Sequence, residues 1–349
     1  MKLNFCTLFN SNYLARGLTL YHSLEEVCAD FHLYVFAFDN AAEDFLKAKN
    51  YPHLTVVGLS EFEDPELLRV KPTRSPAEFC WTCTPSTILY SIEKFGLDHC
   101  TYLDADMRFY HDPAILIKEM GAKDVLLTDH NYTASYDQSV VSGRFCVQFV
   151  LFRNTPNGMK ALRWWRESCN EWCYARAEDG KFGDQKYLDD WETRFEGVHV
   201  LRHPGGGVAP WNVLRFDVFR KNKKPFIRVK ETGEVFPLVF FHFHGVKFFT
   251  NKVVQLCGPA YDVHEDFRFD VYFPYLRELV HTEKSLRENG VAFDPNGASG
   301  TSPLRPWGIR ILLFYYLAHV KNSLKDISGK FLADRRRHHH YYFTSSFSD

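Results

Sequence analysis

The stretch Cys100-Thr101-Tyr102-Leu103, followed at once by Asp104-Ala105-Asp106, decides the fold. A short apolar run of strand type leads directly into two carboxylates, and ligands of open α/β sheets bind at the carboxyl ends of strands. Alternate residues of an extended segment point the same way, so Asp104 and Asp106 are expected to face one side. Taken alone, the tripeptide is also compatible with an ordinary polar turn.

Strand-like and helix-like stretches alternate through the first half of the chain. Apolar runs predict strands, whereas apolar residues at helical spacing predict helices. The expected strands are Leu3–Phe9, His32–Phe38, Leu54–Val57, Cys100–Leu103, Phe145–Phe152 and Leu238–Phe243. One expected helix begins at Tyr13. The other four cover Ala41–Lys49, Ser86–Phe95, Pro156–Ala175 and Gly183–Phe195. This order predicts an α/β fold with a mostly parallel sheet flanked by helices.

The alternation stops near residue 260, which divides the chain into two expected parts. Residues 1–260 would form the sheet domain, and residues 261–349 a helical extension with a basic tail. Ile311–Ala318 could lie in a membrane interface as an amphipathic helix, helped by Arg335-Arg336-Arg337. The alternative is a core helix followed by a solvated tail. No stretch reaches the roughly 18 apolar residues of a membrane span.

Composition excludes two broad classes of protein. The 349 residues carry a formal net charge of −1 and are 45% hydrophobic. A chain-wide electrostatic nucleic-acid binder and an acidic disordered protein are therefore both excluded. The chain has nine cysteines, an odd number, and its start has no leader-like apolar segment. Free thiols in a reducing cytoplasm are expected, and the Cys80–Cys83 pair is a weak redox signal.

Two neighbouring carboxylates repel each other unless a cation lies between them. Hard divalent ions such as Mg²⁺ or Mn²⁺ prefer oxygen ligands and share them with phosphates. Asp104 and Asp106 therefore suggest a metal–diphosphate site. Imidazole can complete such a set, most readily for Mn²⁺, and His242 and His244 would share a face if their segment were extended. Lys247 follows closely and could contact phosphate.

Two further segments carry polar groups suited to a pocket. Gly183-Asp184-Gln185 could project a carboxylate and an amide from a helix start, or could be a simple helix cap. The loop from His203 to Asn212 contains Gly205-Gly206-Gly207 and lacks the pattern of a P-loop. It could line a substrate pocket or form a simple surface loop.

These motifs occur in an order that resembles the GT-A glycosyltransferases, most closely the glycogenin-like family 8 enzymes. The resemblance covers roughly residues 1–255 and rests on the following segments: Phe9-Asn10-Ser11-Asn12-Tyr13-Leu14, Tyr102-Leu103-Asp104-Ala105-Asp106, Asp184-Gln185 and His242-Phe243-His244-Gly245 with Lys247. Two departures stand out. Phe248-Phe249 follow Lys247 where the family has Pro-Trp, and Cys146-Val147-Gln148-Phe149 replaces the family's Asn-Ser-Gly strand.

The resemblance implies a GT-A, Rossmann-like sheet and roles for individual residues. Phe9, Asn12 and Tyr13 would belong to the nucleotide site, with Tyr13 stacked on the base. Asp104 would contact ribose and metal. The implied metal ligands are Asp104, Asp106 and His242; Lys247 would touch the diphosphate, and Asp184 with Gln185 would face the transferred sugar.

The implied reaction is transfer of a hexose from a nucleotide-diphosphate sugar, with uridine favoured, to a glycan, lipid-linked or protein acceptor. The family implies retention at the anomeric carbon, whereas the residues themselves leave retention and inversion open. If the enzyme inverts, Asp184 is the candidate base. The alternatives are a metal-dependent phosphohydrolase and a non-catalytic nucleotide-sugar-binding module. Polysaccharide biosynthesis in the cytoplasm, at times on a membrane surface, is the expected setting, and no nucleic-acid partner is expected.

Overall fold

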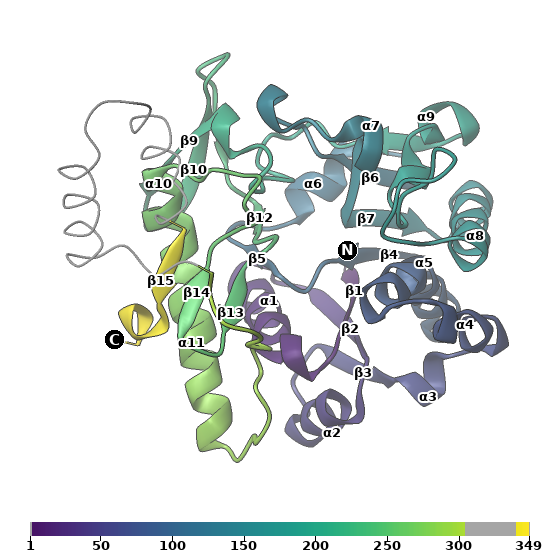
Figure 1. Ribbon diagram of the computed structural model, residues 1–349. Coiled ribbons are helices and arrows are strands. Elements are labelled where there is room, and N and C mark those ends of the chain that lie inside the picture. Colours follow the sequence, from purple (N-terminus) through teal and green to yellow (C-terminus); the bar gives the residue numbers. More distant parts are fainter. Residues whose placement is uncertain (1, 304–339, 349) are drawn as a thin grey trace.

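The computed structural model describes residues 2–303 and 340–348. A seven-stranded sheet forms its centre, in the order β3-β2-β1-β4-β7-β6-β8 (Figure 1). In that order the strands are Leu54–Gly58, Phe31–Ala37, Leu3–Phe9, His99–Leu103, Phe145–Arg153, Val125–Asp129 and Val198–Val200. Only β7 runs antiparallel to its neighbours β4 and β6. The expected α/β fold with a mostly parallel sheet is confirmed.

Helices cover both faces of this sheet because alternate strand residues point to opposite sides. Leu3 and Phe5 of β1 pack with α1 (Leu14–Val27) and α2 (Asn40–Lys49). Cys6 and Leu8 of the same strand pack on the other face with α5 (Pro76–Phe95) and α8 (Pro156–Glu171). The smaller helices on these two faces are α3 (Leu59–Phe62), α4 (Pro65–Val70), α6 (Ala114–Glu119) and α9 (Trp191–Arg194).

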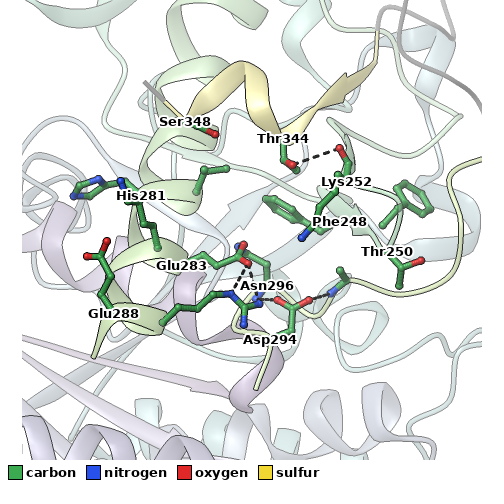
Figure 2. A pocket seen from close by; sticks show the side chains of 15 residues that line it. Phe248, Thr250, Lys252, His281, Glu283, Glu288, Asp294, Asn296, Thr344 and Ser348 are labelled. Atoms are coloured by element: carbon green, nitrogen blue, oxygen red, sulfur yellow. Dashed lines mark hydrogen bonds and ion pairs between the residues drawn. The ribbon is translucent and has the colours of Figure 1, made fainter. Parts of the chain in front are cut away.

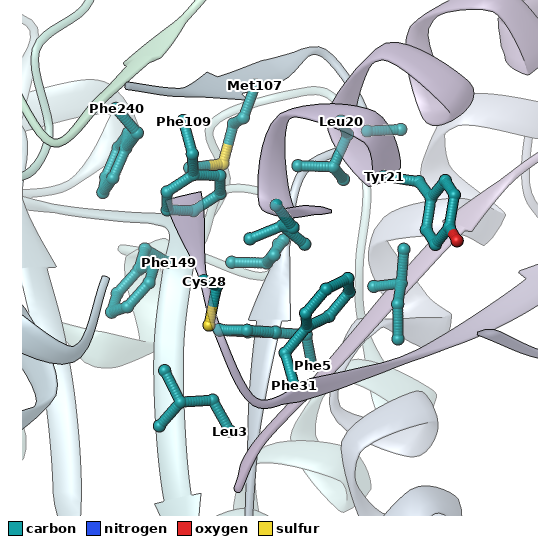
Figure 3. Packing of buried hydrophobic residues seen from close by; sticks show 14 of the residues in the cluster. Leu3, Phe5, Leu20, Tyr21, Cys28, Phe31, Met107, Phe109, Phe149 and Phe240 are labelled. Carbon is teal, nitrogen blue, oxygen red and sulfur yellow. The ribbon is translucent and has the colours of Figure 1, made fainter. Parts of the chain in front are cut away.

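Aromatic side chains join the sheet to a two-stranded ribbon beside it. The ribbon pairs β5 (Met107–Phe109) with β12 (Phe240–His242) in antiparallel register. The ring of Phe240 lies 5.4 Å from that of Phe109 and 5.5 Å from that of Phe149 on β7 (Figure 3). All three rings are fully buried, so the ribbon is held firmly against the central sheet.

The remaining elements lie toward the C-terminal half of the chain. Strands β9 (Phe216–Lys221), β10 (Lys224–Val229) and β11 (Val235–Pro237) form an antiparallel meander. Strands β13 (Lys247–Phe249), β14 (Val253–Gln255) and β15 (Tyr341–Phe343) form a third small sheet. The helical extension consists of α10 (Glu265–Phe267), a π-helical turn (Arg268–Tyr272) and α11 (Phe273–Glu288).

The helical extension packs on the rest of the protein through a common core. Tyr275 and Leu276 of α11 share one buried cluster with Ala15 of α1 and Phe241 of β12. The proposed boundary at residue 260 stays a prediction. Ile311–Ala318 and Arg335–Arg337, on which membrane contact was predicted, lie outside the described residues. None of the helices described is both long and apolar enough to cross a membrane.

Two helix predictions were wrong in extent. The helix expected at Ser86–Phe95 begins ten residues earlier, at Pro76, and runs through Pro85, a residue that normally interrupts helices. Ser75 and Glu78 form a capping box that fixes the true start, and packing against α8 compensates for the proline. The helix expected at Gly183–Phe195 is a turn with two short helical pieces, because Gly183 has a left-handed φ of 53°.

We expect Trp165→Phe to lower the free energy of unfolding by about 1–3 kcal/mol. The Trp165 ring is fully buried, and its Nε1 donates a hydrogen bond of 2.9 Å to the carbonyl oxygen of Asp184. The variant leaves that carbonyl without its partner. Urea denaturation measures the loss, and the partly exposed Trp164→Phe is the matched control. Equal losses in the two variants would contradict this account of Trp165.

Candidate metal centre and sugar-nucleotide site

The turn between β4 and β5 carries Asp104 and Asp106 at the centre of the sheet. The amide of Asp104 donates to the carbonyl oxygen of Gln148 on β7, at 3.2 Å. His242 lies opposite Met107 in the ribbon, and the amide of Phe243 donates to the carbonyl oxygen of Asp106 at 2.9 Å. Backbone pairing therefore brings the end of β12 to the two carboxylates.

The three predicted metal ligands converge. The Nε2 atom of His242 lies 3.1 Å from Oδ1 of Asp106 and 3.7 Å from Oδ2 of Asp104. One ligand atom from each residue lies within 4.8 Å of the others, a combination found nowhere else among the described histidines, cysteines and acids. Two carboxylate oxygens and one imidazole nitrogen suit a hard divalent ion such as Mn²⁺ or Mg²⁺. This group could therefore hold a divalent metal ion.

Burial makes the charges of this group interdependent. Burial alone would lower the pKa of the His242 imidazole, but attraction and hydrogen bonding to Asp106, then hydrogen bonding with Cys146 and attraction to Asp104, raise it well above its ordinary value. Burial raises the pKa of Asp104, and the nearby His242 only partly offsets this. The pKa of Asp106 is lowered, because His242 outweighs the effect of burial there. A proton on His242 thus serves as the countercharge of the acidic pair.

A third carboxylate belongs to the same electrostatic group. Asp184 is buried, and burial followed by repulsion from Asp104 raises its pKa to about 7. The Nε2 of its neighbour Gln185 donates to the carbonyl oxygen of Ser142 at 2.5 Å. Both residues were predicted to face the sugar. Asp184 interacts electrostatically with the metal ligand Asp104. Gln185 is hydrogen-bonded to the short helix α7 (Ser139–Ser142).

The predicted nucleotide residues divide into a buried and an exposed group. The Phe9 ring is only 4% exposed and packs so closely on Gly17 that a Cβ there would lie 2.3 Å from it. Asn12 is exposed, and Tyr13 is 41% exposed. The guanidinium of Arg16 lies 4.4 Å from the centroid of the Tyr13 ring. Although the residue as a whole is exposed, desolvation of its hydroxyl by the surrounding protein and then the charge of Asp106 raise the pKa of Tyr13, so the ring lies within the electrostatic range of the acids.

The end of β12 leads to the remaining predicted residues. Lys247 is exposed, with its Nζ 5.2 Å from the centroid of the Phe249 ring, and a contact with diphosphate stays a prediction. His244 is also exposed, because the strand ends at His242. Its ring centroid lies 5.6 Å from that of His242, but it is not part of the metal-ligating group. The expectation that both histidines share one face, made for an extended segment, stays a prediction; the two rings lie 5.4 and 5.5 Å from the ring of Trp211.

Sequence reasoning did not identify the residues that pack against His242 and form hydrogen bonds with it. The glycine-rich loop is buried from Gly205 to Asn212, and its Val208 carbonyl accepts the amide of His242 at 3.0 Å. Trp211 packs edge-on against the His242 ring at 5.4 Å. Gln148, a lone amide in the otherwise apolar β7, accepts a hydrogen bond from His242 at 2.7 Å. A single polar residue inside an apolar strand was the available signal.

A separate cavity of about 610 Å³ lies between α11, the turn after β13 and the last described residues (Figure 2). Glu283 in its wall accepts hydrogen bonds from Arg287 and from Asn296. None of the three predicted metal ligands lines it. Arg16 connects the two regions, because it donates to the carbonyl oxygens of Asn296 and Val246 at 3.1 and 3.0 Å.

The raised pKa of Asp184 predicts a particular pH dependence of stability. With a folded-state pKa of about 7 against an ordinary 3.8, the folded protein binds this proton more tightly than the unfolded chain does. Stability must then fall as the pH rises between these two values. Asp184→Asn resembles the protonated carboxyl at every pH. We expect this variant to gain stability relative to the wild type as the pH is raised from about 5 to about 8.

Urea denaturation in the presence of a chelator measures this difference. The exposed Asp44→Asn is the matched control and should keep the wild-type pH dependence. If the free energies of unfolding of the wild type and Asp184→Asn follow parallel curves with pH, the buried carboxyl does not titrate as described.

Comparison with known proteins identifies close relatives without an assigned activity. No family model matches the chain. The uncharacterized protein YfnD of Bacillus subtilis strain 168 is 34% identical over 308 residues, which cover 86% of this chain and 94% of YfnD. The uncharacterized protein YfnF of the same strain is 30% identical over 290 residues, which cover 80% of this chain and 90% of YfnF.

The solved structures that match this chain are less similar to it in sequence than YfnD and YfnF are. Mouse xyloside xylosyltransferase 1 is 12% identical, with a TM-score of 0.44, over 69% of this chain and 97% of its own. The galactosyltransferase LgtC is 14% identical, with a TM-score of 0.43, over 79% of this chain and 95% of its own. The 34% identity to YfnD, over 86% of this chain and 94% of YfnD, shows that this protein belongs to the same family as YfnD.

Proposed function

We propose that this protein is a metal-dependent GT-A glycosyltransferase of the hexosyltransferase type. It would move a sugar from a nucleotide-diphosphate donor, with uridine favoured, to a glycan, lipid-linked or protein acceptor. The convergence of Asp104, Asp106 and His242 at the carboxyl end of β4 carries the proposal. The order of the motifs, which resembles the glycogenin-like family 8 enzymes, supports it.

Asp104, Asp106 and His242 would hold the divalent ion, which is Mn²⁺ in our proposal, with Mg²⁺ as the second choice. When bound, such an ion supplies Lewis-acid stabilisation of the negative charge that develops on a nucleoside-diphosphate leaving group. Lys247, exposed five residues after His242, would add a cation toward the same phosphates. The lowered pKa of Asp106 favours its ionised form, which suits a metal ligand.

Tyr13 and Asn12 would bind the nucleoside. The half-exposed Tyr13 ring would offer one face to a base. The Arg16 guanidinium lies over the ring, 4.4 Å from its centroid. An aromatic ring of this kind can stack favourably on any flat base. Phe9 would support this site through its packing on Gly17 rather than through an exposed ring.

Asp184 would face the transferred sugar, with Gln185 beside it. A carboxyl with a pKa of about 7 can hold or release a proton under working conditions. We infer retention at the anomeric carbon from the family resemblance; under inversion, Asp184 would serve as the base. The reaction would take place in the cytoplasm, a setting that accords with the nine free cysteines, and would serve polysaccharide biosynthesis.

We expect Asp106→Ala to reduce sugar transfer by about 100-fold or more, because losing a metal ligand removes several kcal/mol of charge stabilisation. The donor is first identified by thermal shift with a panel of nucleotide sugars, with and without Mn²⁺. Transfer is then measured with a pool of glycan and lipid-linked acceptors. Asp112→Asn, at an exposed residue whose Oδ1 accepts the amide of Ala114, is the matched control and should keep full activity.

Three results would overturn the proposal. Full transfer by Asp106→Ala, or by the wild type in excess chelator, would remove the metal from the reaction. Release of sugar phosphate together with nucleoside monophosphate without any acceptor, at a rate that acceptors do not raise, would indicate the phosphohydrolase. Mn²⁺-dependent binding of nucleotide sugar with no turnover in any acceptor pool would indicate a binding module.

A further inference from the structure

Gln148 is the residue that fixes the imidazole of His242 in the orientation the metal centre needs. We propose this positioning role on the ground of one buried contact, and it rests on the proposed metal-dependent function. Gln148 is fully buried in β7, and its Oε1 lies 2.7 Å from Nδ1 of His242. No role in substrate binding is assigned to it.

The contact determines which ring nitrogen carries a hydrogen. An amide oxygen can only accept, so Nδ1 of His242 must carry the hydrogen that is donated to Gln148. The Nε2 atom then remains as the nitrogen that faces Asp106 at 3.1 Å and Asp104 at 3.7 Å. A metal ligand needs a free lone pair on that nitrogen, and a second hydrogen-bond partner on the other nitrogen supplies the correct tautomer.

Gln148 also connects to the acidic side of the centre through its backbone. Its carbonyl oxygen accepts the amide of Asp104 at 3.2 Å. One residue thus holds Asp104 by the main chain and His242 by the side chain. The carbonyl of Val208 and the edge-on Trp211 restrict the position of His242 from other sides. They do not distinguish one ring nitrogen from the other, and Gln148 does.

The side-chain amide of Gln148 is retained at an energetic cost. Its Nε2 atom is buried and has no hydrogen-bond partner among the described residues. A buried donor without a partner destabilises a protein by about 1–3 kcal/mol. The neighbouring Gly207 has a φ of 105° and lies in ordinary van der Waals range of this Nε2, which a Cβ at Gly207 would approach to 3.4 Å. An apolar strand residue would avoid the cost, and this points to a role for the acceptor oxygen.

The test compares Gln148→Met, which keeps the length of the side chain, with Gln148→Glu, which keeps an acceptor. Mn²⁺ binding to the full-length variants is measured by electron paramagnetic resonance of the free ion. We expect Gln148→Met to lose about 10–100-fold in affinity, as other supporting partners of metal-bound histidines do. Gln148→Glu should restore most of it. Thr128→Val is the matched control, because it removes a buried hydrogen bond of β6 to Phe149 and does not contact His242.

A second measurement reads the tautomer directly and needs no metal. Nitrogen-15 resonances of His242, identified by their loss in His242→Gln, are recorded in metal-free protein at a pH where the ring is neutral. The wild type should carry its hydrogen on Nδ1, and Gln148→Met should shift the hydrogen toward Nε2. A wild-type hydrogen on Nε2, or an unchanged tautomer in Gln148→Met, overturns the positioning role.

The two readouts separate failure of this inference from failure of the proposed function. Mn²⁺ affinity equal in the wild type, Gln148→Met and Thr128→Val would overturn the role of Gln148 and leave the metal centre standing. A wild type that binds no Mn²⁺ would instead overturn the metal-dependent function, while the tautomer measurement still decides the role of Gln148. Circular dichroism and urea denaturation establish that each variant is folded before it is compared.

Discussion

The antiparallel pairing of β5 with β12 is the constraint on which the candidate site depends. This pairing sets His242 opposite Met107. The hydrogen bond from the Phe243 amide to the Asp106 carbonyl extends the pairing by one residue. Two segments far apart in the chain therefore meet in one register. Because side chains alternate along a strand, a slip of one residue would turn the imidazole away from the carboxylates. The geometry of the acidic group is a consequence of strand pairing.

Such a group is costly to bury, and the surrounding core supplies the compensation. Ionisable side chains in an apolar setting destabilise a protein unless they are paired. Here the ring of Phe240, two residues before His242 along the chain, packs with Phe109 and Phe149 in the same fully buried layer. On the other side, the helical extension contributes Tyr275, which stacks on the ring of Phe243 at 3.6 Å. The C-terminal helix thus stabilises the segment that carries the histidine.

The sequence was informative wherever local pattern and chemistry agreed. The strands of the parallel sheet follow from apolar runs, and the pairing of Asp104 and Asp106 with His242 follows from ligand chemistry together with family resemblance. Local rules failed at Pro85, where packing on α8 overrides the proline, and at Gly183, where a left-handed residue interrupts an apparent helix. The contact between Gln148 and His242 joins distant strands, and no local pattern encodes it.

The three carboxyl groups near His242 differ in their readiness to ionise, and burial alone cannot explain the order. Asp106 has a lowered pKa because it lies closest to the imidazole. The pKa of Asp104, farther from that ring, is raised, and Asp184 is raised by burial and by Asp104 itself. Positive charge held between the first two would reduce the repulsion that Asp104 exerts on Asp184. Cation binding and the protonation of Asp184 are therefore linked through a single shared neighbour, so neither can change without affecting the other.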